Sequence, residues 1–130
     1  MADRKTPKRD GVQIVLDVAA ATIVEQGKMT AVNAAGDAVP AANTAGLKVM
    51  GRAEQRVDNS LGAAGDLQVE VLRLHAFKFK NSSTSPVTAA EIGSNVMVED
   101  AETVAKDTTN DIVAGKCLGV DPDGVWVEIQ

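Results

Sequence analysis

The chain has 130 residues, a net charge of −5, one cysteine and, as aromatic residues, two Phe, one Trp and no Tyr. This length suits one compact domain, and the scarcity of aromatic side chains requires a core of Val, Leu, Ile and Ala. The lone Cys117 excludes an internal disulfide and a tetrahedral cysteine metal site.

The first ten residues are predicted to form a flexible arm, because they are charged, contain Pro7 and lack apolar periodicity. Four basic residues oppose two aspartates there, which gives the arm +2 and leaves −7 on residues 11–130. This acidic body argues against nucleic acid as a partner. The side chains that we expect to contact an acidic partner surface are Arg4, Lys5, Lys8 and Arg9.

No secretory or membrane-spanning segment is predicted. The arm is not followed by the apolar run that a signal peptide needs, and the apolar-rich residues 14–24 are interrupted by Asp17 and too short to cross a bilayer. We therefore expect synthesis in the cytoplasm, no secretion and no membrane partner.

The first predicted strand follows the arm, where Val12, Ile14 and Leu16 alternate with a two-residue period. The alanines at 19–21 are equally compatible with a helix. From residue 28 to 51 the chain is rich in Ala, Gly, Asn and Thr, with turn signals at 36–37 and 43–46, so we expect short strands and loops. The small side chains of this segment would also allow its surface to lie flat against a neighbouring protein.

The clearest apolar alternation runs from residue 67 to 80, and its phase changes twice. The apolar positions are 67, 69 and 71, then 72, 74 and 76, and then 77 and 79. A strand that changes face usually contains a bulge or a sharp bend. The pattern therefore predicts a small barrel or a tightly curled sheet.

The rest of the chain reads as strands separated by polar turns. Residues 81–86 and 107–111 are loops by composition, and residues 116–129 predict a hairpin whose turn is Asp-Pro-Asp-Gly at 121–124. The glycines at positions 36, 65 and 93 are each followed by a polar residue and then by an expected strand. The prediction is a mainly β protein with one domain over residues 11–130.

Residues suited to catalysis are scarce. His75, the one histidine, is predicted to lie in the middle of a strand in a structural or solvent-facing role, and Cys117 is predicted to be a buried thiol. Neither has a partner for nucleophilic chemistry nearby in the sequence. We therefore predict that the protein is not an enzyme and uses no cofactor.

Two acidic clusters are interpreted as turns rather than metal sites. Asp121 and Asp123 resemble the start of a calcium loop but lack its closing glutamate. Glu99, Asp100 and Glu102 are expected to form a solvated turn.

Segments spread over residues 28–130 resemble, in order and spacing, the head-decoration proteins of tailed bacteriophages. The segments that carry the resemblance are 34–37 (Ala-Ala-Gly-Asp), 49–54 (Val-Met-Gly-Arg-Ala-Glu), 64–71, 76–79, 92–100, 115–120 and 125–127. The chain departs from the family at Met97, where an aromatic residue is common, and over residues 69–79, which are more charged. The first thirty residues have no counterpart.

The resemblance implies a small single-domain β-barrel or β-tulip-like fold and no catalysis, to which the composition of the first ten residues adds the flexible arm. It further implies a virion structural protein that binds the outer surface of the capsid as a homotrimer and cements the expanded head. Its partner would be the major capsid protein, contacted in part through the basic arm.

Two other functions are compatible with the sequence. A phage tail-tube or head–tail connector subunit also uses a small β fold, but it closes rings. A small β-barrel module that binds carbohydrate or peptide usually displays exposed aromatic residues, and Trp126 is the single tryptophan here.

Overall fold

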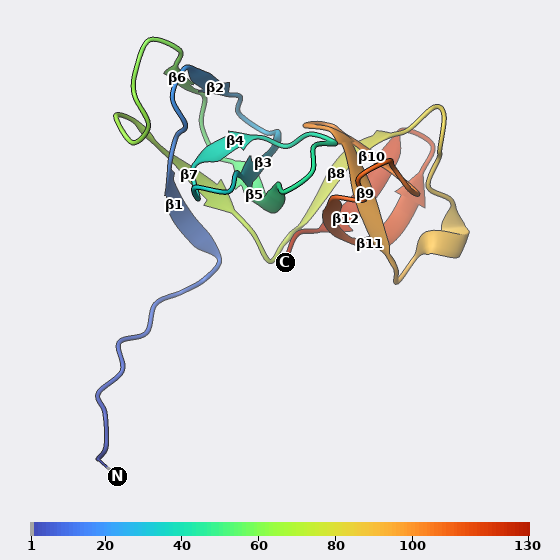
Figure 1. Ribbon diagram of the computed structural model, residues 1–130. Coiled ribbons are helices and arrows are strands. Elements are labelled where there is room, and N and C mark those ends of the chain that lie inside the picture. Colours follow the sequence, from blue (N-terminus) through green and yellow to red (C-terminus); the bar gives the residue numbers. More distant parts are fainter. Residues whose placement is uncertain (1) are drawn as a thin grey trace.

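The computed structural model describes residues 2–130 and is mainly β, which confirms that part of the predicted fold class. Figure 1 shows the strands. They are β1 (Gln13–Asp17), β2 (Thr22–Val24), β3 (Met29–Val32), β4 (Ala38–Pro40), β5 (Lys48–Ala53), β6 (Val57–Asn59), β7 (Gln68–Leu72), β8 (Ala76–Asn81), β9 (Asn95–Asp100), β10 (Thr103–Ala105), β11 (Val113–Asp121) and β12 (Gly124–Glu128). A short 3₁₀ helix, η1 (Ala89–Glu91), precedes β9.

The N-terminal half is an antiparallel sheet in the order β1-β7-β5-β3-β4, and β2 pairs separately with β6. Its two outer strands approach each other at one point, where Val18, just after β1, forms a parallel bridge to Ala38. The curled sheet therefore encloses a core of its own. That core consists of Val18, Val24, Ala38, Ala53, Val57, Val69 and Val71.

In the C-terminal half, the strands β10-β8-β12-β11-β9 close into a barrel. The β8–β10 pair is parallel and the others are antiparallel. Figure 1 shows the sheet and the barrel side by side, with the barrel in yellow to red. The barrel core holds both phenylalanines, and Met29, Ala31 and Ala41 of the N-terminal half belong to the same cluster. The two halves are therefore packed together.

The alternation over residues 67–80 proves to be two strands rather than one bulged strand. β7 belongs to the sheet and β8 to the barrel, and residues 73–75 link them. Leu74 in this link has a φ of +63° and donates its N–H to the carbonyl of Ile129 at 2.6 Å. The changes of phase thus mark a crossover between sheets. The mid-strand position predicted for His75 was wrong, because the residue lies in this link and is exposed.

Glycine turns precede β4, β7 and β9, as predicted. Gly36, Gly65 and Gly93 have φ values of +84°, +84° and +91°. Residues with a side chain rarely adopt this conformation, which explains the repeated glycine at these positions.

Three of the seven alanines in residues 28–51 are buried and so are not available to a neighbouring protein. Ala31, Ala38 and Ala41 are buried in the two cores, whereas Ala34 and Ala35 lie in the exposed β3–β4 turn. Small buried side chains allow the sheet and the barrel to pack closely.

The predicted arm lies outside the sheets. Residues 2–10 belong to no strand or helix and are exposed throughout, and Met1 lies outside the described residues. Figure 1 shows the arm projecting from the start of β1, away from the sheet and the barrel. In residues 2–130, no helix has the length and apolar character needed to cross a membrane.

Candidate functional site

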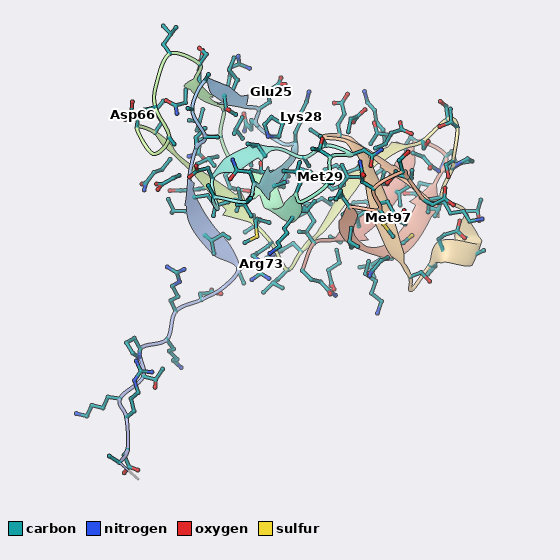
Figure 2. The ribbon with its side chains drawn as sticks, viewed as in Figure 1. Glu25, Lys28, Met29, Asp66, Arg73 and Met97 are labelled. Carbon is teal, nitrogen blue, oxygen red and sulfur yellow. The ribbon has the colours of Figure 1, made fainter. Side chains whose placement is uncertain are left out.

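The four basic side chains of the arm are exposed, and within residues 2–130 none of them forms an ion pair. Inside the arm, Arg4 Nη1 donates a hydrogen bond to Thr6 Oγ1 at 3.4 Å. Figure 2 shows the arm side chains clear of the body. The arm, which extends over about 30 Å if fully stretched, can therefore present its cationic groups to a partner surface.

The root of the arm is fixed by Arg73, in the link between the two halves. Its Nη1 donates to the Gly11 carbonyl at 3.0 Å, and its backbone N–H donates to the Val12 carbonyl at 2.8 Å. The N–H of Val12 in turn donates to Asp10 Oδ1 at 3.0 Å. The chain is therefore held from Asp10 onward, while residues 2–9 make no hydrogen bond to residues 11–130.

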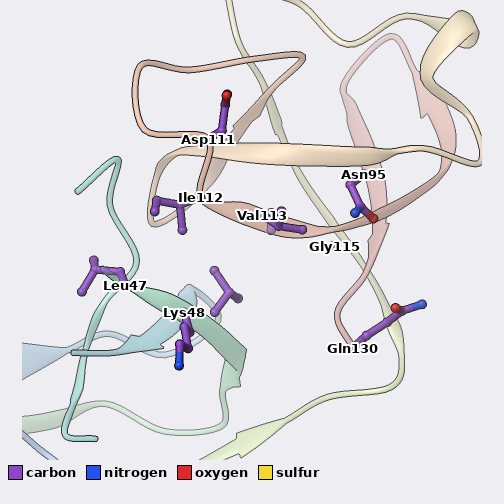
Figure 3. A pocket seen from close by; sticks show the side chains of 10 residues that line it. Leu47, Lys48, Asn95, Asp111, Ile112, Val113, Gly115 and Gln130 are labelled. Atoms are coloured by element: carbon purple, nitrogen blue, oxygen red, sulfur yellow. The ribbon is translucent and has the colours of Figure 1, made fainter. Parts of the chain in front are cut away.

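A groove of about 380 Å³ opens between the sheet and the barrel. Figure 3 shows Leu47 and Lys48 of the sheet facing Ile112 and Val113 of the barrel, with Gln130 at one end. Lys48 and Asp111 are its charged lining residues. Such a lining suits a mainly apolar segment that carries a polar group.

The loop between β6 and β7 presents one apolar side chain at its tip. Leu61 is fully exposed. The loop is held by buried Asn59, whose Nδ2 donates to the carbonyls of Val18, Ala19 and Ala63 at 3.0–3.3 Å. Sequence reasoning missed this anchor, because an asparagine before Ser-Leu-Gly has no pattern that distinguishes it from an ordinary turn residue.

The cluster predicted as a solvated turn is partly engaged in contacts. Glu102 binds Lys80 at 2.9 Å and Lys28 at 3.7 Å, and Glu99 accepts a hydrogen bond from Ser82 Oγ at 2.5 Å. The hydrogen bond from Lys80, together with the charge of Lys28, lowers the pKa of Glu102. Through Lys28, Glu102 connects the two halves, whereas the Glu99–Ser82 contact lies within the C-terminal half. Among residues 2–130, no group of three His, Cys, Asp or Glu is placed to hold a metal ion.

The acidic residues of the predicted hairpin turn also have structural partners. Asp123 Oδ1 lies 2.6 Å from Lys78 Nζ, and this hydrogen bond lowers the pKa of Asp123. Trp126 Nε1 donates to Asp121 Oδ2 at 2.9 Å. The turn between β11 and β12 therefore lies where predicted and is tied to β8 by Lys78.

His75 and Cys117 do not contact each other through a hydrogen bond in residues 2–130, and their surroundings differ. His75 is exposed, and its Nδ1 lies 3.0 Å from the carbonyl oxygen of Arg73. Cys117 is buried in the barrel, as predicted, and burial raises the pKa of its thiol. A raised pKa disfavours the reactive thiolate.

Comparisons of the chain with protein-family models, curated proteins and solved structures found no match.

Proposed function

We propose that the protein is a non-enzymatic virion protein that binds the outer surface of a tailed-phage capsid and stabilises the expanded head. The observation that carries the proposal is the arm. It holds four cationic side chains that form no ion pair with any residue of the described range 2–130, and it projects from a body whose net charge is −7. A segment of this kind suits attachment to a large acidic surface.

Attachment through the arm has definite energetic consequences. The arm would order on binding, and the entropy lost would offset part of the contact energy. Its charges would be exposed to solvent before binding, so the attraction would weaken as salt screens it. The body would then contribute contact area rather than a deep pocket.

The resemblance to head-decoration proteins also supports the proposal. Its segments fall in the turn before β4, in β5, in the turn and strand of β7, and in β8, β9, β11 and β12. They thus span both the sheet and the barrel. A β-tulip-like fold, a homotrimer and the major capsid protein as partner form part of the proposal on this ground.

Co-sedimentation with expanded, undecorated capsids tests the proposal. We expect saturable binding at a fixed copy number and a higher capsid disruption temperature. The double variant Lys8→Gln/Arg9→Gln should bind roughly tenfold more weakly at low salt, because two charge contacts are lost.

The matched control is Lys106→Gln/Lys116→Gln, which removes two exposed body lysines that form no ion pair within residues 2–130. This variant should bind like the wild type. Absence of binding would contradict the proposal, and binding confined to a single vertex or a tail end would favour a connector or tail subunit.

A further inference from the structure

β1 is an edge strand with one unpaired side. It pairs with β7 in continuous register, from Gln13 opposite Leu72 to Asp17 opposite Gln68. Within residues 2–130, the other side of β1 pairs with no strand. The contact with β4 lies just past β1, where Val18 forms a bridge to Ala38. Figure 1 shows β1 at the outer rim of the sheet, directly after the arm.

The hydrogen-bonding direction of each residue in β1 follows from the flanking contacts. The Val12 carbonyl accepts from the Arg73 N–H, and the Val18 N–H donates to the Leu67 carbonyl. Because these positions alternate in an antiparallel pair, even-numbered residues bond to β7. Gln13 and Val15 therefore turn their N–H and carbonyl groups away from the sheet.

This edge lacks the devices that usually prevent pairing with another chain. Such devices are lysine, proline, a bulge or a very short strand. β1 has five residues, Gln-Ile-Val-Leu-Asp, in unbroken register, and Val15 is 55% exposed. By contrast β4, at the opposite side of the sheet, has three residues and ends in Pro40.

Unpaired charges of opposite sign lie at the two ends of β1. The arm cations are at its start. At its other end are Asp17, Asp66, whose neighbour Gly65 donates its N–H to the Val18 carbonyl, and Asp37, next to the Val18–Ala38 bridge. None of these three carboxylates forms an ion pair within residues 2–130. Figure 2 shows Asp66 and Arg73, which holds the arm root, at opposite ends of the strand.

We propose that in the free protein, away from the capsid lattice on which the homotrimer is proposed, β1 pairs antiparallel with β1 of a second copy about a two-fold axis at Ile14. In this arrangement the outward groups of Gln13 and Val15 bond across the axis. Because the strands run in opposite directions, the basic arm of each copy passes the carboxylates at the end of its partner's β1. A second copy is the occupant that supplies both the strand and the complementary charge.

Sedimentation velocity of the purified full chain, from micromolar to millimolar concentration, tests this inference without any capsid. We expect a reversible dimer that weakens between about 0.05 and 0.5 M NaCl, as screened charges require. Val15→Pro removes an N–H that β7 does not use, so the fold should persist. The dimer dissociation constant should rise about ten- to hundredfold, because two intermolecular hydrogen bonds are lost.

Val15→Thr is the matched control, since it keeps the N–H and the branched side chain and should leave the dimer intact. Lys8→Glu/Arg9→Glu lies in the arm, which cannot unfold the body, and should weaken the dimer; adding Asp17→Lys/Asp37→Lys should restore it. A protein that stays monomeric throughout would overturn the inference, as would an oligomer that a folded Val15→Pro variant leaves unchanged. Either result would leave capsid binding to its own test.

Discussion

At the scale of single residues, three positions other than glycine within residues 2–130 have a positive φ: Ala21 at +54°, Leu74 at +63° and Asp111 at +48°. This conformation costs a residue with a Cβ roughly 1–2 kcal/mol. For Leu74 the crossover between sheet and barrel requires it, whereas Ala21 lies in an exposed turn before β2. Ala21 is therefore the position where relief of strain should be seen most cleanly.

Ala21→Gly should raise the free energy of unfolding by up to about 1 kcal/mol, because the relief of strain exceeds the extra flexibility of the unfolded chain. Urea denaturation measures the change. Ala20→Gly is the control, since Ala20 is also exposed but has no positive φ. It should lower the stability, and equal losses in both variants would show that position 21 is not strained.

At the scale of elements, β11 contains two glycines in different surroundings. A Cβ on Gly115 would lie 2.2 Å from the carbonyl oxygen of Glu128, in the neighbouring part of the barrel, whereas one on Gly119 would lie 3.6 Å from the Trp126 ring. Only the first contact is with backbone that cannot move aside. Closure of the barrel therefore depends on Gly115.

Gly115→Ala should destabilise the protein by about 1–3 kcal/mol, the range typical of overpacking. Gly119→Ala, in the same strand, should change the stability little. Thermal unfolding of both variants followed by circular dichroism makes the comparison. A Gly115→Ala protein that melts with the wild type would mean that β11 and β12 are not packed so closely.

Sequence patterns predicted those elements whose signals are local. The alternation around Ile14 identified β1, and Asp-Pro-Asp-Gly identified the β11–β12 turn. The turns before β4, β7 and β9 were predicted because a turn with positive φ favours glycine, and glycine is visible in the sequence. The crossover at residues 73–75 was misread, because leaving one sheet for another changes the phase of alternation just as a bulge does. Burial of Ala31 depends on packing between the halves and burial of Ala38 on the curling of the sheet, and local patterns report neither.

At the scale of the whole molecule, Glu102 joins the two halves. It follows β9 in the barrel and binds Lys80 of β8 and Lys28, which precedes β3 of the sheet. Nearby, the Met29 N–H donates to the Ala101 carbonyl at 2.7 Å. The arm, by contrast, was predicted from its charge, Pro7 and the lack of apolar periodicity, all of which are local features of the sequence.

The junction should weaken in acid. The lowered pKa of Glu102 means that its contribution is complete above the usual glutamate value of 4.5 and is lost as pH falls through the lowered value. Glu102→Gln should therefore lower the urea midpoint at pH 7, and this difference from the wild type should shrink progressively as the pH falls below 4.5. Glu128→Gln, whose carboxylate contacts Gln130 instead, should show no such convergence. A pH-independent difference for Glu102→Gln would assign its effect to packing.

The single crossing of the chain from sheet to barrel has a consequence for biosynthesis. Every strand of the sheet has emerged from the ribosome once Leu72 is clear, so this half can form its own core early. The barrel must wait for β12, which pairs with β8 and β11. During that interval Met29, Ala31 and Ala41 lack their barrel neighbours. The nascent chain therefore passes through a stage in which this apolar surface of the sheet is uncovered. Slow translation of the last third would prolong the time during which chaperones or other nascent copies can bind that surface.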